Sequence, residues 1–233
     1  MKKGFMRLAL AVFVLFAPVA VLSAPIDTYA DEACTANEVA SIKVGDMYSG
    51  AAVQYQITSV TPVAYNGAQY EGTVRAVGWG SLGYRNTTEL TLDNLALMTS
   101  GTTHRFLLTD IASGVFNNDP QLTKLTINGN VKTIRSYTFS NCSALTNITI
   151  HGKGLKKIEK KAFANCIHVT DFEIHSSKFK ASKNAFKRMG AAMSYGTVKI
   201  PKKGYKKVLK QLKKGGFTVD SSIHTIKKMK KTY

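Results

Sequence analysis

The chain has 233 residues, and its 32 Lys and Arg against 14 Asp and Glu give a formal net charge of +18. This length allows one or two domains with a sizeable core. Three cysteines are too few for a disulfide framework, and their spacing is too irregular for a zinc site. The composition therefore excludes small disulfide-stapled scaffolds and zinc-finger domains.

Residues 1–30 have the pattern of a secretory signal peptide. Basic residues precede an apolar run, 8–22, that is too short to span a bilayer comfortably. Cleavage after Ala30 is favoured over cleavage after Ala24, because Pro25 would follow the scissile bond in the second case. The alternative is an uncleaved N-terminal anchor. We expect an exported protein, secreted or at the cell surface, without a membrane-spanning segment once the signal is removed.

Two stretches of the chain have Ile, Phe and Asn-Cys at matching positions. They are IRSYTFSNCSALTNITI, which begins at Ile134, and IEKKAFANCIHVTDFEI, which begins at Ile158. The phenylalanine of this pattern recurs at nearly equal steps along the chain, at Phe116, Phe139, Phe163 and Phe186. A fixed period of this length is typical of a stacked solenoid, because one repeat cannot bury its own apolar face. The sequence predicts a β-solenoid.

Each repeat contains a short stretch in which apolar and polar residues alternate, as in LTNITI, which is strand periodicity. Its Leu and Ile side chains are expected to face the core. In-register stacking would align the polar side chains as a ribbon on an exposed parallel sheet. The predicted ligand-binding ribbon consists of Lys124, Thr126, Asn147, Thr149, Asp171, Glu173 and Lys199.

These repeats resemble the BspA-like leucine-rich repeats of bacterial surface proteins. The stretches VKTIRSYTFSNCSALTNITI and LKKIEKKAFANCIHVTDFEI carry the likeness to that family's unit I-x-x-x-A-F-x-x-C-x-x-L-x-x-I-x-I, over about residues 106–201. The resemblance implies a leucine-rich repeat fold with short turns or helical turns opposite the strands. It also implies a bacterial adhesion protein of the cell surface that binds a protein or a host extracellular matrix ligand.

The segments on either side of the repeats are expected to cap them, because the ends of the core must be covered. Residues 31–105 are predicted to form an N-terminal β cap with a first degraded repeat at residues 88–92. Within it, residues 53–60 and 72–79 are predicted to form strands on either side of the dipeptide Asn66-Gly67, which favours a hairpin turn. Trp79 and Tyr84 either form a small exposed aromatic patch or close the core.

Residues 202–233 are predicted to form a basic C-terminal cap made of a helix and a strand. Apolar residues at i, i+3, i+4 and i+7 give the helix one narrow apolar stripe, and two glycines end it. The stripe consists of Tyr205, Val208, Leu209 and Leu212, followed by Gly215 and Gly216. A lysine-rich helix of this kind either serves as a solvated cap or lies on an anionic surface.

The positive charge is concentrated in the last third of the chain. Residues 151–233 carry 22 Lys and Arg but 4 Asp and Glu, whereas residues 1–150 carry 10 of each. Such asymmetry suggests a polyanionic partner, and for an exported protein anionic cell-wall polymers are favoured over nucleic acid. The alternative is a merely solvated surface. The predicted polyanion-binding lysines are Lys202, Lys203, Lys206, Lys207, Lys210, Lys213, Lys214, Lys227, Lys228, Lys230 and Lys231.

No motif of catalysis, cofactor binding or phosphate binding emerges, so we expect no enzyme activity, no cofactor and no metal. His151 and His175 occupy matching positions in successive repeats and could form a weak metal site with Glu173. Asp171 and Glu173 lie on one face of a predicted strand. Glycoside hydrolysis needs acids that flank the scissile bond within a cleft, and the sequence indicates neither a second flanking acid nor a cleft. We expect an exported, monomeric interaction protein that binds through its ribbon. The alternative is a cell-wall polyanion-binding module that acts through its C-terminal lysines.

The sequence favours free thiols at the three cysteines. Stacking would bring Cys142 and Cys166 to within about 5 Å of each other, a strand spacing. This distance permits a disulfide, but parallel side chains make the Cβ approach awkward, so two buried thiols are favoured. Cys34 is expected to be exposed and unpaired.

Overall fold

A computed structural model describes residues 42–50, 52–65, 67–80, 87–99, 102–218 and 224–229. All of them belong to one compact unit, residues 33–233. The expected signal peptide, Cys34, Tyr84, Lys230 and Lys231 lie outside the described residues.

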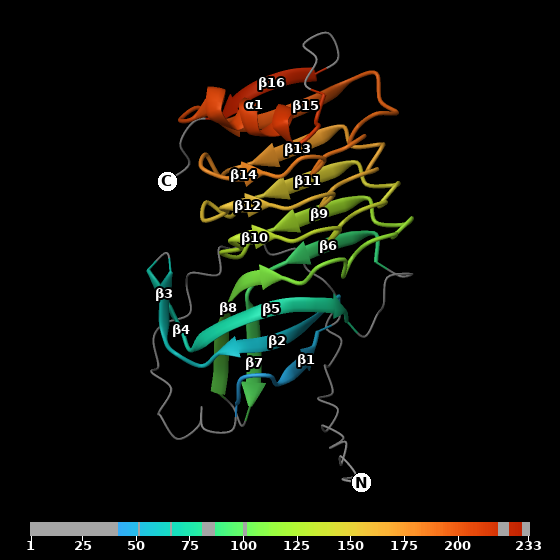
Figure 1. The fold of residues 1–233 in the computed structure, drawn as a ribbon. Coiled ribbons are helices and arrows are strands. Elements are labelled where there is room, and N and C mark those ends of the chain that lie inside the picture. Colours follow the sequence, from blue (N-terminus) through green and yellow to red (C-terminus); the bar gives the residue numbers. More distant parts are fainter. Residues whose placement is uncertain are drawn as a thin grey trace, which may run out of the picture. The chain divides into compact units, whose positions relative to one another are not determined.

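Six parallel strands stack in register to form one wall of the solenoid (Figure 1). They are β6 (Glu89–Leu92), β9 (Lys124–Ile127), β11 (Asn147–Ile150), β13 (Asp171–Ile174), β15 (Gly196–Pro201) and β16 (His224–Met229). Leu90 pairs with Leu125, which confirms that residues 88–92 begin the array. The predicted β-solenoid is confirmed, with about four complete turns.

A second, eight-stranded sheet joins the solenoid to the N-terminal part of the unit. Its strands are β1 (Met47–Ser49), β2 (Val53–Ser59), β5 (Gly72–Trp79), β7 (Leu95–Thr99), β8 (Thr102–Ile111), β10 (Thr133–Ile134), β12 (Lys157–Ile158) and β14 (Lys180–Ala181). Strand β8 pairs in parallel with both β5 and β10, so the sheet runs without a break from the N-terminal strands into the turns. A separate hairpin, β3 (Val63–Tyr65) and β4 (Ala68–Tyr70), lies around Gly67.

A column of stacked phenylalanine rings fills the centre of the solenoid. Phe139 and Phe163 stack with centroids 5.4 Å apart, and each stacks on the next phenylalanine of the column. Trp79 packs edge-on against Phe116 at one end, and Phe217 packs against Phe186 at the other. Trp79 therefore closes the core, one of its two predicted roles.

The turn that contains each phenylalanine has two backbone positions with positive φ, four residues apart. The first position is held by Gly114, Tyr137, Lys161 and Asn184, and the second by Asn118, Asn141, Asn165 and Arg188. Positive φ suits Gly because it has no Cβ to clash with the backbone, and Asn because its short polar side chain can form local hydrogen bonds. At the second position the asparagine amides form a ladder: Asn165 donates to Asn141 and Asn141 to Asn118, both over 2.8 Å.

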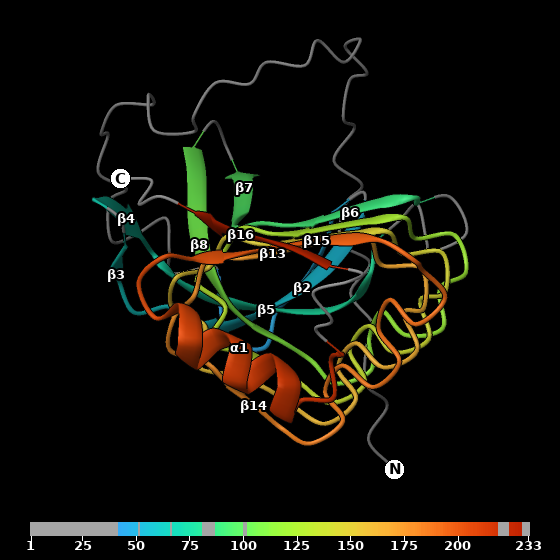
Figure 2. The same cartoon turned by 90° about the horizontal axis from the view of Figure 1, so that it is seen from above.

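Helix α1 (Tyr205–Lys214) packs over the last turn, and the lower part of Figure 2 shows it beside β14 and away from the six-stranded sheet. Val208 and Leu212 are buried, as the apolar stripe predicts. The side chain of Gln211 accepts a hydrogen bond from the backbone of Ala181, and Gly215 accepts one from Phe186. These contacts satisfy backbone donors at the end of the eight-stranded sheet and the phenylalanine column.

Asp110 connects the N-terminal strands with the first turns. Its carboxylate lies 2.7 Å from the guanidinium of Arg75 on β5 and 2.9 Å from that of Arg135 after β10. Burial by itself would raise the pKa of Asp110. The hydrogen bonds and charges of the two arginines outweigh it, so the pKa lies below its ordinary value.

We expect Asp110→Asn to destabilise the protein by about 1–3 kcal/mol at pH 7, because two charge-assisted hydrogen bonds are weakened. The folded-state pKa is depressed, so the carboxylate stabilises the fold above about pH 4 and this contribution disappears as the pH falls through the folded pKa. Urea unfolding between pH 7 and pH 2.5 measures the difference between wild type and variant. A difference that stays constant over this range would contradict the prediction.

Candidate binding surfaces

The outward face of the six-stranded sheet, here called the strand face, brings together all seven residues of the predicted ribbon. Lys124, Asn147 and Asp171 form one row, which begins at Glu89 and continues through Thr197 to Thr225. A second row continues from Thr91 and contains Thr126, Thr149, Glu173, Lys199 and Lys227. The alternation of buried and more exposed residues along each strand places these side chains on the solvent side.

The charges of the strand face are largely paired with one another. The Lys124 ammonium lies 2.9 Å from Glu89, and Glu173 lies 3.2 Å from Lys199 and 2.7 Å from His175. Burial would raise the pKa of Glu173, but hydrogen bonds from His175 and Lys199 outweigh it and hold the pKa below its ordinary value. Glu173 is therefore ionised at neutral pH, and the face presents charges of both signs close to balance.

Threonines stabilise the edge of the strand face where each strand begins. The hydroxyl of Thr123 donates to the carbonyl of Thr88, and the hydroxyls of Thr146 and Thr170 each donate to the carbonyl one turn earlier. These hydrogen bonds repeat with the turns, so the start of each strand is held to its neighbour by side chain as well as backbone. The result is a stiff, polar surface.

The two histidines beside the strand face lie close to each other. The rings of His151 and His175 lie 4.8 Å apart between centroids. Partial burial, together with the neighbouring His175, lowers the pKa of His151. Within the described ranges, no group of three or more His, Cys, Asp or Glu side chains is arranged to hold a metal ion.

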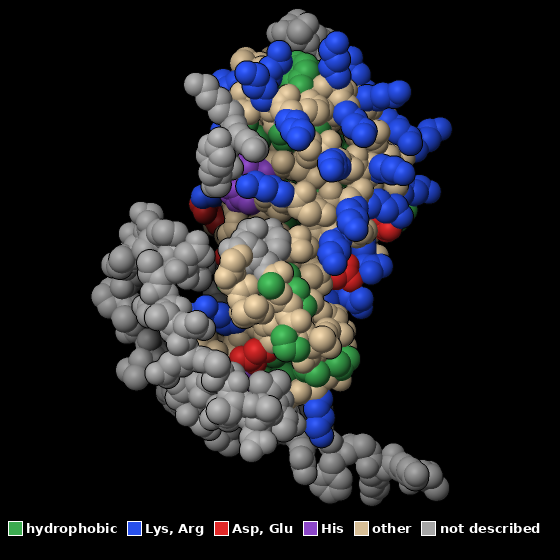
Figure 3. All heavy atoms as spheres, turned by 90° about the vertical axis from the view of Figure 1, so that its left-hand side faces the viewer, with side chains coloured by type: hydrophobic (Ala, Val, Ile, Leu, Met, Phe, Trp, Pro, Cys, Tyr) green, Lys and Arg blue, Asp and Glu red, His purple; other side chains and the backbone are tan. Residues whose placement is uncertain are grey.

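The predicted C-terminal lysines project from α1, from the loop before it and from β16. All nine that the structure describes are exposed, and none forms an ion pair with a described carboxylate. Figure 3 shows Lys and Arg side chains spread over the upper part of the unit and along one edge of it, with few acids among them. This surface therefore carries a strong positive field.

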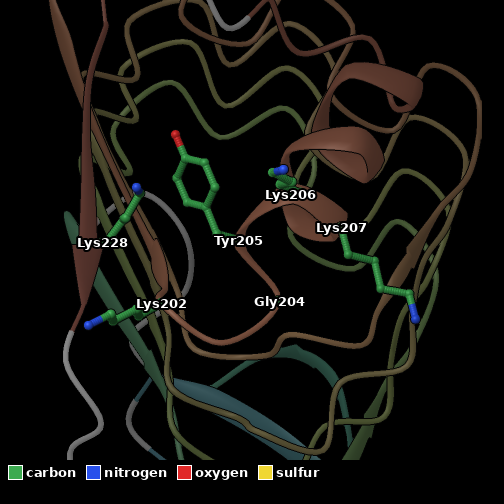
Figure 4. A pocket seen from close by; sticks show the side chains of 6 residues that line it. All are labelled: Lys202, Gly204, Tyr205, Lys206, Lys207 and Lys228. Atoms are coloured by element: carbon green, nitrogen blue, oxygen red, sulfur yellow. The ribbon is translucent and has the colours of Figure 1, made fainter.

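Four of these lysines surround a shallow hollow of about 540 Å³ at the start of α1. Tyr205 stands in the hollow, and the ammonium of Lys228 lies 4.5 Å from the centre of its ring (Figure 4). The other lysines at the hollow are Lys202, Lys206 and Lys207. The tyrosine that the sequence assigned to the apolar stripe thus contacts a lysine at the surface.

A second hollow, of about 350 Å³, lies on the turns and was not predicted from the sequence. Its lining includes Tyr137, Lys161 and Arg188, all of which have positive φ. Each lies one period along the chain from a Gly or Asn of its own column, as Tyr137 does from Gly114 and Arg188 from Asn165. That spacing is the sequence signal that could have identified them, but the Phe and strand columns alone do not contain it.

The two described cysteines are free thiols, as predicted. Each donates a hydrogen bond to a backbone carbonyl of the preceding turn, Cys142 to Phe116 over 3.2 Å and Cys166 to Phe139 over 3.1 Å. Both are completely buried. The thiols therefore connect neighbouring turns without a covalent bond.

The register and the repeating turns define a leucine-rich repeat solenoid. A family model for the BspA-type leucine-rich repeat region matches six copies over residues 109–229, more than half of the chain. The chain therefore belongs to the BspA-type leucine-rich repeat family, and the resemblance seen in the sequence is confirmed. The match extends past residue 201 to β16, whose parallel pairing with β15 continues the array.

The chain is also similar to a crystal structure of a leucine-rich repeat protein from Bacteroides ovatus. The sequences are 21% identical, the TM-score is 0.43, and the match covers 63% of this chain and 35% of that one. The chain thus spans about a third of that protein's length. None of the curated proteins matches the chain.

Leucine-rich repeat solenoids are typically scaffolds that bind proteins, and members of this family are typically surface or secreted proteins of bacteria. Across the residues that the structure describes, no helix has the length and apolarity required to cross a bilayer.

Proposed function

We propose that the protein is an exported, non-enzymatic interaction protein that binds a protein or extracellular matrix ligand through the strand face. One observation carries the proposal: the seven ribbon residues share one face of a parallel sheet, in register over four strands. Side chains on such a sheet are already ordered, so a ligand loses little affinity to the entropy of ordering them.

The charge pattern supports a protein partner over a simple polyanion on this face. Lys124 is paired with Glu89, and Lys199 with Glu173. Charges of both signs favour a partner with a complementary mixed surface, because a uniformly charged polymer would be repelled by one of the two signs.

The test is the variant Thr149→Arg, measured against an array of immobilised extracellular matrix proteins by surface plasmon resonance. Thr149 lies at the centre of the strand face, between Thr126 and Glu173. A long charged side chain there should weaken a specific interaction by about tenfold or more. Thr133→Arg on β10 makes the same substitution in the other sheet and should leave the affinity unchanged. Equal losses from the two variants would contradict binding through this face.

We propose as a second candidate that the C-terminal lysines bind an anionic cell-wall polymer. The observation that favours it is the absence of ion pairs between the nine described lysines and any described carboxylate. The repeats would then act mainly as a scaffold, and α1 would serve both to cap the core and to present its lysines.

Co-sedimentation with purified bacterial cell walls tests this candidate. Binding should be strong at about 20 mM salt and lost at about 500 mM, because screening shortens the range of exposed charges. A variant with Gln at Lys206, Lys207, Lys210 and Lys213 should bind weakly even at low salt. Binding that persists at high salt, or that survives in this variant, would contradict the lysine surface as the anchor.

A further inference from the structure

The hollow on the turns combines three kinds of side chain in a small space. It is lined by an aromatic ring, by two amides of the asparagine ladder and by three cations, from Tyr137, Asn141, Asn165, Lys161, Lys187 and Arg188. The turns that form it lie away from the six-stranded sheet (Figure 2). This hollow is separate from the strand face and from the hollow around Tyr205.

The backbone shows that three of these residues occupy positions to which their type is poorly suited. Tyr137 has a φ of 60°, Lys161 of 58° and Arg188 of 61°. Neighbouring turns place Gly114, Asn118, Asn141, Asn165 or Asn184 in the same two columns, where positive φ is least strained. Strained backbone of this kind is concentrated at functional sites, because folding alone would favour the less strained residue.

The exposed tyrosine and its cation are arranged together. Tyr137 is 41% exposed although it is a large aromatic residue. The ammonium of Lys161, one turn further along, lies 5.2 Å from the centre of its ring. The ring therefore positions a cation at the hollow while part of its own surface stays open to a ligand.

The asparagine ladder ends inside the hollow. Asn165 donates its amide hydrogen to Asn141, and the next residue of the column is Arg188. No described residue donates a hydrogen bond to the side-chain oxygen of Asn165. This oxygen can accept a hydrogen bond from a hydroxyl group, next to a guanidinium that can bind a carboxylate.

The charges of the hollow are not neutralised by the protein. No Asp or Glu lines it, and Lys161, Lys187 and Arg188 form no ion pair with a carboxylate of the described residues. An anion that enters would meet three cations without displacing an existing partner.

We propose that this hollow binds a carboxylate-bearing sugar residue of an acidic polysaccharide. The carboxylate would contact Arg188, Lys187 and Lys161, the sugar ring would lie against Tyr137, and hydroxyl groups would bond to the ladder amides. A bare phosphate would use the cations alone, whereas an acidic sugar also uses the aromatic ring and the amides. The proposal is independent of a protein ligand on the strand face.

Isothermal titration of the full chain with an oligogalacturonate tests the site, with the methyl-esterified oligosaccharide as the neutral counterpart. The variants Tyr137→Asn and Arg188→Asn introduce a residue that favours positive φ, so the fold should be retained and the melting temperature should stay equal or rise. Each variant should bind the acid about tenfold more weakly, because it loses a ring contact or a charge-assisted hydrogen bond.

The matched control is Lys178→Asn, which removes one exposed positive charge outside the hollow. It should leave the affinity unchanged within about twofold. The proposal is overturned if the wild type does not bind the oligogalacturonate, if the ester binds as well as the acid, or if Lys178→Asn weakens binding as much as Arg188→Asn. The two hollow variants should still bind a protein ligand through the strand face. A loss of sugar binding alone would therefore concern the hollow and not the proposed protein-binding function.

Discussion

Replacing Phe163 by alanine is expected to lower the free energy of unfolding by about 3–5 kcal/mol. Phe163 is completely buried and stacks on Phe139 and Phe186, with centroids 5.4 and 5.9 Å away. The substitution removes burial of a large side chain and leaves a cavity between two rings. In a repeat protein the contacts between neighbouring turns supply much of the stability, so the loss acts where two turns meet.

Chemical denaturation followed by circular dichroism measures this change, with Phe163→Leu as the control. Leucine fills most of the space, so its expected loss is about 1–1.5 kcal/mol. A loss below about 1 kcal/mol for alanine would show that the neighbouring rings collapse into the space and that the column is not the centre of the core. Equal losses of unfolding free energy for the alanine and leucine variants would show that the stacking of the aromatic rings, and not the filling of space, supplies the stability.

Cys142 and Cys166 are expected to react with iodoacetamide at least about a thousandfold more slowly in the folded protein than in the unfolded chain. The thiolate is the reactive form, and burial raises the pKa of Cys142 to about 12 and raises that of Cys166 well above its usual value. Both side chains are also inaccessible to reagent. Reaction therefore requires the turns to open.

Peptide mass mapping after labelling in native buffer and in guanidinium chloride measures the labelling rate of each cysteine in the folded and in the unfolded protein. The peptide with Cys34 is scored on its own, because this residue lies outside the described part of the chain. Prior treatment with a reductant should not change the native labelling of Cys142 and Cys166, since both are free thiols. A disulfide-linked peptide, or native labelling within about tenfold of the unfolded rate, would contradict the buried thiols.

Much of the array was predictable because its columns repeat in sequence with a nearly constant period. The phenylalanines gave the period, and the alternation in LTNITI gave the side of each strand that faces the core. The pairing of Leu90 with Leu125 was predictable even though the segment between them is longer than a repeat, because the apolar pattern of the strand was kept. Helix α1 was predictable from its apolar stripe and from the two glycines that end it.

The N-terminal strands were less predictable, because their pairing depends on contacts between distant residues. The turn at Gly67 was expected between the long strands β2 and β5. Instead it closes the short hairpin β3–β4, while β2 and β5 pair with each other outside it. Nothing in the local sequence indicates that β8 would pair with both β5 and β10, or that Asp110 would lie between Arg75 and Arg135.

The sequence by itself determined the solenoid, the side of the strands that faces solvent and the residues of the strand face, because a nearly constant period leaves one way to stack the apolar columns. The tertiary structure alone decided which side chains meet between turns. The pairing of Glu173 with Lys199, the asparagine ladder and the grouping of Tyr137, Lys161 and Arg188 around one hollow all join residues one or two turns apart. Their contacts depend on side-chain direction and backbone φ, which the period of a sequence does not specify.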